Sequence, residues 1–230
     1  MATKMVKKRK LKVLHFILFL LILVLLGLFV YFMLHSKTKN ILIKNNNYLS
    51  DEEIITLAKI EDYPSFYLTT SHDIKKRLKK NPFIKEVKVK KGFYHVLTLD
   101  ISENKPLFFY ETDQKVVLEN EEEVELDNRE QLRIPRVMNY VPNTKYQSLI
   151  KNIKKIDEDI LGKISEMTYV PNEYDKDRFL LYMDDDNSVY LTLTKFKMIN
   201  YYNKVLQQLE GKKGVLYLDN GNHFQIRSEG

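Results

Sequence analysis

The chain has 230 residues, 44% hydrophobic and 30% charged, which is the balance of a folded protein and not of a disordered one. Its formal net charge is +6, but residues 1–12 alone carry six basic side chains and no acidic one, so the rest of the chain is neutral. That distribution argues against nucleic-acid binding, which needs a concentrated basic surface on the folded part. The absence of cysteine excludes disulfides, thiolate metal sites and cysteine nucleophiles.

A long uncharged segment, residues 16–34, follows the basic stretch. As a helix it would be about 28 Å long, close to the hydrocarbon thickness of a bilayer. We therefore predict a transmembrane helix over residues 13–35, preceded by a basic arm over residues 1–12.

The basic arm also predicts the direction in which the helix crosses the membrane. Basic residues are retained on the cytoplasmic side, so we expect the arm in the cytoplasm and the rest of the chain outside it. The expected topology determinants are Lys7, Lys8, Arg9, Lys10 and Lys12. A cleaved signal peptide is the alternative, but its apolar region is usually about 7–15 residues long and ends in small residues. This segment instead exits through FMLHSKTK, which favours an uncleaved anchor.

Beyond the anchor the sequence predicts a strand followed by two helices. Asn40–Lys44 (NILIK) alternates apolar and polar residues, as a strand does. Ser50 precedes Glu53 by three residues, the spacing of a capping box at the start of a helix. Ser71 is expected to cap a second helix, which should end before Pro82 because the residue before proline avoids the helical conformation.

Two further strands should complete this small domain. Residues 83–90 (FIKEVKVK) and 94–102 (YHVLTLDIS) both alternate, and the second places Leu97, Leu99 and Ile101 on one face. The expected order of elements is therefore β-α-α-β-β.

The remainder of the chain predicts a larger mixed domain with a large antiparallel sheet. Its expected strands are residues 107–110, 116–118, 179–183, 189–193, 215–218 and 224–226, and its expected helices are residues 144–162 and 196–209. Residues 119–125 are acidic and predict a turn, and residues 184–187 predict the turn of a hairpin.

No motif in the chain predicts catalysis, a metal or a cofactor. The nucleophile, zinc-binding and phosphate-loop signatures are absent, and the five histidines lack ligand spacing. Residues 184–187 lack the central glycine and distal glutamate of a calcium loop. Residues 121–123 are consecutive glutamates, whose side chains alternate sides and so do not converge as an acid/base pair would. The basic run at residues 75–80 is typical of a solvated helix face, with contact to anionic lipid or wall polymer as the alternative.

The order of these parts resembles the FtsQ/DivIB family, bitopic cell-division proteins of bacteria. The resemblance covers the whole chain and is carried by residues 41–46 with the capped helix start at 50–53, and by residues 81–89, 103–106 and 133–137. The sequence departs from the family pattern at Asn45, where glycine is usual, and at Asn104, where arginine is usual.

The resemblance implies a single transmembrane helix followed by an α+β ectodomain, with a POTRA domain over residues 38–106 and a β-rich FtsQ/DivIB domain over residues 107–228. It implies a non-enzymatic divisome scaffold at the septum that binds FtsL and FtsB/DivIC-like bitopic proteins and helps regulate septal peptidoglycan synthesis. In FtsQ-like proteins the partner adds a strand to the C-terminal sheet edge. The matching contacts here would be Tyr217, Leu218, Phe224 and Ile226.

Two alternative functions stay open. Another POTRA-bearing assembly protein, one that feeds an outer-membrane barrel, would need several modules and many strands of about ten residues, for which the chain has no room. A membrane-anchored envelope enzyme would need a nucleophile, a base or a metal site. A turnover assay on peptidoglycan precursors would reveal such an enzyme.

Overall fold

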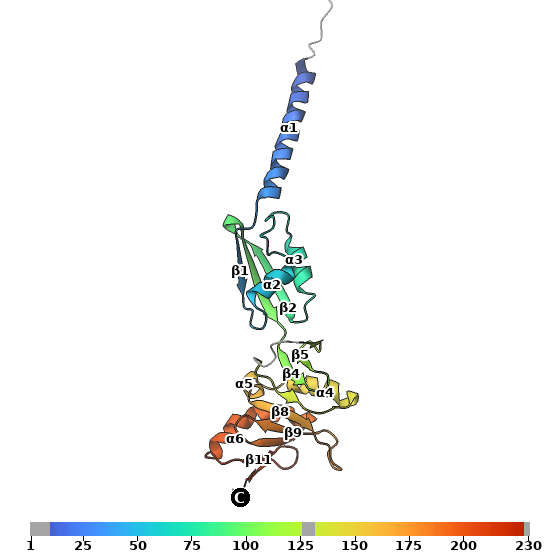
Figure 1. Cartoon of the computed structure of the whole chain (residues 1–230), viewed down its shortest axis with the longest axis vertical. Coiled ribbons are helices and arrows are strands. Elements are labelled where there is room, and N and C mark those ends of the chain that lie inside the picture. Colours follow the sequence, from blue (N-terminus) through green and yellow to red (C-terminus); the bar gives the residue numbers. More distant parts are fainter. Residues whose placement is uncertain (1–9, 126–131, 228–230) are drawn as a thin grey trace, which may run out of the picture. The chain divides into compact units, whose positions relative to one another are not determined.

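The computed structural model describes residues 10–125 and 132–227, and the chain divides into two compact units at Glu103 and Asn104 (Figure 1). The first unit begins with helix α1 (Lys10–His35), of which Val13–His35 is long and apolar enough to cross a membrane. The most apolar window of this span is not buried by any other described residues, as expected for a single-pass anchor and not for a core helix. Lys7, Lys8 and Arg9 lie outside the described residues, and Lys10 and Lys12 belong to α1.

The rest of the first unit confirms the predicted β-α-α-β-β order. It consists of β1 (Asn40–Lys44), α2 (Asp51–Ala58), α3 (Ser71–Leu78), β2 (Ile84–Lys91) and β3 (Val96–Glu103). The capping box at the start of α2 is present, since Ser50 accepts from the Glu53 N–H and the Glu53 carboxylate accepts from the Ser50 N–H. The cap of α3 is Thr70, one residue before the expected Ser71, because the Thr70 hydroxyl accepts from the Asp73 N–H.

The sheet of this unit has the order β1-β3-β2, with β1 parallel and β2 antiparallel to β3. Leu97, Leu99 and Ile101 of β3 are buried as predicted, in a core shared with α2 and α3. Residues 94 and 95 were expected in β3 but lie in a short 3₁₀ turn, η1 (Phe93–His95), where both have positive φ angles of 58° and 59°.

A buried carboxylate at the end of β3 binds the loop between β1 and α2. Glu103 is only 8% exposed, and its Oε2 accepts from the backbone N–H groups of Asn47 and Tyr48 at 2.6 and 2.8 Å. Its Oε1 accepts from the N–H of Leu49 at 3.0 Å. The last residue of β3 therefore holds the loop between β1 and α2 in place.

The second unit contains a sheet of nine described strands in the order β12-β11-β10-β9-β8-β7-β4-β5-β6. The strands are β4 (Pro106–Tyr110), β5 (Lys115–Leu118), β6 (Glu123–Val124), β7 (Arg136–Val137), β8 (Ile164–Tyr169), β9 (Arg178–Met183), β10 (Ser188–Thr192), β11 (Gly214–Tyr217) and β12 (His223–Ile226). Figure 1 shows several of them in this order, from β5 and β4 through β8 and β9 to β11.

The sheet is mixed, so the prediction of an antiparallel sheet was wrong in part. Three of its pairings are parallel, namely β4 with β7, β7 with β8, and β10 with β11. The predicted hairpin at residues 184–187 is confirmed as the antiparallel β9–β10 pair. The predicted acidic turn over residues 119–125 contains the short strand β6.

The helices of this unit are shorter than predicted. The expected helix over residues 144–162 is divided into α4 (Asn143–Ile153) and α5 (Glu158–Leu161), separated where Asn200 accepts from the Asp157 N–H at 3.0 Å. The helix expected over residues 196–209 is the 3₁₀ helix η3 (Leu193–Tyr201) followed by α6 (Tyr202–Gln208). One apolar core joins helices and sheet, with Leu149, Phe179 and Phe196 among its buried members.

Candidate functional site

The candidate site is the free edge of the nine-stranded sheet at β12. Among the described strands β12 pairs only with β11, antiparallel, with Leu216 opposite Phe224 and Tyr217 opposite His223. Each strand of a sheet has two sides that carry hydrogen-bonding groups, so β12 leaves one side unpaired.

The register identifies which backbone groups are unpaired on β12. The N–H of Arg227 donates to the carbonyl of Lys213 at 2.8 Å, and Gly214 stands opposite Ile226. Hydrogen-bonded and non-bonded pairs alternate in an antiparallel ladder, so the backbone groups of Phe224 and Ile226 point away from β11. Two N–H donors and two carbonyl acceptors are thereby available to an added strand.

The opposite edge of the sheet is protected against such pairing. Strand β6 has only two residues, and the Glu123 side chain on it accepts from the Tyr146 hydroxyl at 2.8 Å. Acidic residues flank it at Glu121, Glu122 and Glu125. Short length and like charges are the usual means of blocking an edge strand, so β12 is the edge that can accept a partner strand.

The structure places the four predicted contact residues differently. Ile226 is 55% exposed, Phe224 is half-buried against the core, and Tyr217 is half-buried on the opposite face of the sheet. Leu218 is only 7% exposed and belongs to the core, so its side chain offers little surface to a partner. Neighbouring residues of an extended segment point to opposite faces, so Tyr217 and Leu218 do not both face one partner.

A row of stacked side chains crosses the sheet on the face away from the core. The guanidinium of Arg178 on β9 lies 3.7 Å from the ring centre of Tyr190 on β10. Tyr190 stacks on Tyr217 at 5.3 Å, and Tyr217 stacks on His223 of β12 at 4.7 Å. Cation–π and stacking contacts each contribute modestly, but together they tie the edge strand to three inner strands.

The turn between β11 and β12 is anchored by two cations. Arg178 donates to the Asp219 carboxylate at 2.6 Å, in a pair whose side chains are only 17% and 9% exposed. The Lys195 amine donates to the carbonyls of Leu218 and Asp219 at 3.2 and 2.9 Å. Because the ion pair is largely shielded from water, its attraction is screened less than that of a surface pair.

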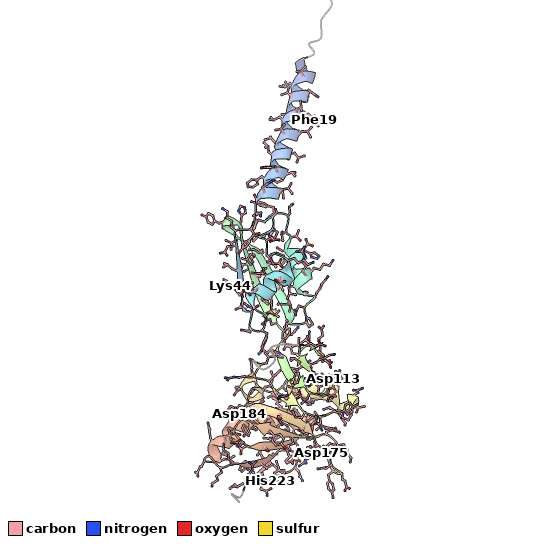
Figure 2. The ribbon with its side chains drawn as sticks, in the orientation of Figure 1. Phe19, Lys44, Asp113, Asp175, Asp184 and His223 are labelled. Atoms are coloured by element: carbon pink, nitrogen blue, oxygen red, sulfur yellow. The ribbon has the colours of Figure 1, made fainter. Side chains whose placement is uncertain are left out.

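The acidic hairpin turn at residues 184–187 supports β11 through a polar network. The Asp185 carboxylate accepts from the hydroxyl of Tyr202, which is 2% exposed, at 2.8 Å. Buried Asn187 donates to Asp185 at 3.1 Å and accepts from the Gly214 N–H at 2.8 Å. Burial, and then the hydrogen bond to Asp185, raise the pKa of Tyr202, so the phenol stays protonated. Figure 2 labels Asp184 in this turn and His223 on β12.

Removing the Asn187 amide should loosen the edge. In Asn187→Ala the buried Gly214 N–H loses its acceptor, and we expect about 2 kcal/mol of lost stability at β11 and β12. Hydrogen exchange on the detergent-solubilised chain should show faster exchange at residues 214–227. The matched control is Asn172→Ala, whose side chain accepts two backbone N–H groups in an exposed loop. Equal exchange in both variants would contradict this role.

Sequence reasoning missed Arg178, Tyr190, Asn187 and Gly214 as parts of the site. Each acts on a residue far along the chain, as Asn187 does on Gly214. The only local signal was the polar turn at residues 184–187, which the sequence predicts as a solvated turn. Its carboxylate and amide instead point at partners from α6 and β11.

Two family models match the chain in succession. The model of the POTRA domain, FtsQ-type, matches residues 36–104, and the model of the cell division protein FtsQ/DivIB, C-terminal, matches residues 110–220. A solved structure of the major extracytoplasmic domain of DivIB from Geobacillus stearothermophilus covers 47% of the chain, at 20% identity and a TM-score of 0.38. That structural likeness is too low to carry an argument.

Curated relatives match most of the chain. The cell division protein DivIB of Bacillus anthracis is 31% identical over 94% of this chain and 84% of its own length. The DivIB of Bacillus cytotoxicus is 30% identical over 91% of this chain and 85% of its own length. The DivIB of Bacillus subtilis is 25% identical over 83% of this chain and 74% of its own length. With matched domains in succession and relatives of this identity, the chain belongs to the FtsQ/DivIB family of cell-division proteins.

Proposed function

We propose that this protein is a non-enzymatic divisome scaffold whose β12 edge binds a division partner by strand addition. The observation that carries the proposal is the open edge at Phe224 and Ile226, whose backbone groups have no partner strand in the described part of the sheet. An added strand gains hydrogen bonds from the edge and specificity from alternate side chains. The expected partners are FtsL-like and FtsB/DivIC-like bitopic proteins, through which the scaffold would help regulate septal peptidoglycan synthesis.

The proposed topology puts the β12 edge outside the cytoplasm. Six basic residues precede the α1 span, and the arm that carries them is expected to stay inside. Both units then lie on the side where small bitopic proteins expose their extracytoplasmic segments. A protease added to intact protoplasts should digest both units and spare the basic arm.

A charge on the edge should weaken partner capture. Ile226 is 55% exposed beside the unpaired backbone groups, and Ile226→Asp puts a carboxylate where an apolar contact is expected. We expect binding of the FtsB/DivIC-like partner to fall about tenfold, as for the loss of one apolar contact. Co-purification from detergent-solubilised membranes would measure it.

The control for this variant is Tyr174→Asp, in the loop between β8 and β9, where the side chain is 96% exposed. That change should leave capture at the level of the unmodified chain. Unchanged capture by Ile226→Asp would reject the edge-strand site and leave the family assignment untouched.

Septal localisation tests the scaffold role separately. A fluorescent fusion should concentrate at midcell in dividing cells. A uniform membrane signal would contradict the septal role even if partner capture persisted. An ectodomain that turned over peptidoglycan precursors, with loss of turnover in a point variant, would favour the envelope-enzyme alternative.

A further inference from the structure

Two loops of the first unit lie at the end where α1 joins it. Helix α1 ends at His35 and β1 begins at Asn40, so the start of β1 is close to the membrane span. Asn40 pairs with Val96, and Leu97 pairs with Lys91. The register thus brings the β2–β3 turn, residues 92–95, to the same end of the sheet.

The loop between α2 and α3, residues 63–69, contacts the last turn of α1 directly. The Ser65 hydroxyl donates to the carbonyl of Met33, a residue of the span, at 2.5 Å. The Phe66 N–H donates to the carbonyl of Ser36 at 2.7 Å, and the Tyr67 ring lies 6.0 Å from that of Phe32. This loop therefore lies beside the C-terminal end of the span.

The turn is fastened to this loop. The His95 ring packs edge-on against Phe66 at 4.9 Å and Tyr67 at 5.7 Å. The Lys91 amine donates to the Phe66 carbonyl and lies 5.1 Å from the centre of the same ring. The two loops consequently form one continuous surface at the end of α1.

This surface exposes large apolar side chains. Phe93 is 92% exposed, Tyr94 87%, Leu68 50% and Tyr67 42%. Tyr94 also has a positive φ of 58°, a backbone conformation that is costly for a bulky residue. Packing inside the unit does not explain why a strained turn presents two aromatic rings to solvent. A cluster of exposed apolar side chains of this kind marks an interaction surface.

We propose that this membrane-proximal face, formed by Tyr67, Leu68, Phe93 and Tyr94, inserts into the headgroup region of the bilayer that α1 crosses. Tyrosine rings favour this region because it accommodates an apolar body with a polar tip, and the apolar side chains of Phe93 and Leu68 gain by leaving water. Lys37 and Lys39, between α1 and β1, lie in sequence where phosphate groups would be met. The first unit is then held to the lipid surface at a second place besides α1. The inference rests on α1 spanning the bilayer and not on a role in division.

Tryptophan scanning tests the proposal, because the chain contains no tryptophan. Phe93→Trp introduces a single tryptophan, which can be excited apart from the tyrosines, into the full chain reconstituted in phosphatidylglycerol–phosphatidylcholine vesicles. We expect its emission to shift to shorter wavelength relative to the unfolded chain, and to be quenched by lipids that carry a spin label near the headgroup. The matched control is Lys44→Trp, an exposed position at the opposite end of β1, where neither effect is expected. Figure 2 labels Lys44 on that strand.

The outcomes are distinct. Emission of Phe93→Trp that matches Lys44→Trp in shift and quenching would overturn the proposal. A photoreactive side chain at position 93 that crosslinks to a protein in cells, with no quenching in vesicles, would assign this face to a protein partner and also overturn it. The vesicles contain no division protein, so failure of the β12 site has no bearing on the result.

Discussion

Replacing Glu103 with alanine should destabilise the first unit by about 4 kcal/mol, as the loss of several charge-assisted hydrogen bonds at a buried site predicts. Three backbone N–H groups, those of Asn47, Tyr48 and Leu49, converge on its two carboxylate oxygens. Without the carboxylate these three N–H groups have lost their acceptor, and the loop between β1 and α2 loses its link to β3. Urea unfolding of the detergent-solubilised chain, followed by hydrogen exchange at residues 40–103, would measure the loss.

Glu103→Gln keeps the size of the side chain but removes its charge and one of its acceptor oxygens. A glutamine has one acceptor oxygen, so it can keep the two bonds now made by Oε2 or the single bond made by Oε1, but not all three. We expect about half of the loss seen for alanine. Glu86→Ala, an exposed carboxylate on β2 of the same unit, is the matched control and should change little. A Glu103→Ala chain as stable as that control would show that the loop is held by other contacts.

Replacing Gly214 with alanine should detach β12 from the sheet. A Cβ at this position would lie 2.1 Å from the carbonyl oxygen of Gln225 and 2.9 Å from a ring carbon of Phe224. The first of these atoms is backbone, so β12 itself must move. We expect about 3 kcal/mol of lost stability at the β11–β12 pair, in the range of an overpacked core. Partner capture should be lost with it, because the edge is no longer held in register.

Gly162→Ala is the matched control for this prediction, since the nearest atom to its Cβ is 3.5 Å away, an ordinary contact. Hydrogen exchange should show fast exchange at β12 in Gly214→Ala and native exchange in Gly162→Ala, with the rest of the unit protected in both. Full partner capture by Gly214→Ala would mean that the partner does not need β12 in its place. Ile226→Asp changes one side chain on an intact strand, so the two variants together separate strand position from side-chain contact.

Local signals predicted the first unit well. The Ser50–Glu53 capping box and the alternation of Leu97, Leu99 and Ile101 depend on residues close in sequence, and both are found as expected. The role of Glu103 was not predictable, because its three partners lie more than fifty positions earlier.

The second unit was predicted less completely for the same physical reason. Short strands such as β7 take their place between partners that are distant in sequence, and β10 and β11 pair in parallel only because η3 and α6 return the chain. At the edge, Leu218 and Ile226 lie on the same face of the sheet, but Leu218 is buried in the core and Ile226 is exposed on the edge strand. To decide which residues of β11 and β12 can contact a partner, one needs the register of the two strands, which the local sequence does not specify.

The parallel pairing of β1 with β3 has a mechanical consequence. The anchor enters the first unit at Asn40, the start of β1, and the chain leaves it at Glu103, the end of β3. A force that pulls the anchor and the exit apart acts in opposite directions along two strands joined by the register from Asn40–Val96 to Lys44–Asp100. Such a force loads the ladder in shear, so its hydrogen bonds resist together and are not unzipped one at a time. The first unit can thereby carry tension from the anchor at Asn40 to its exit at Glu103.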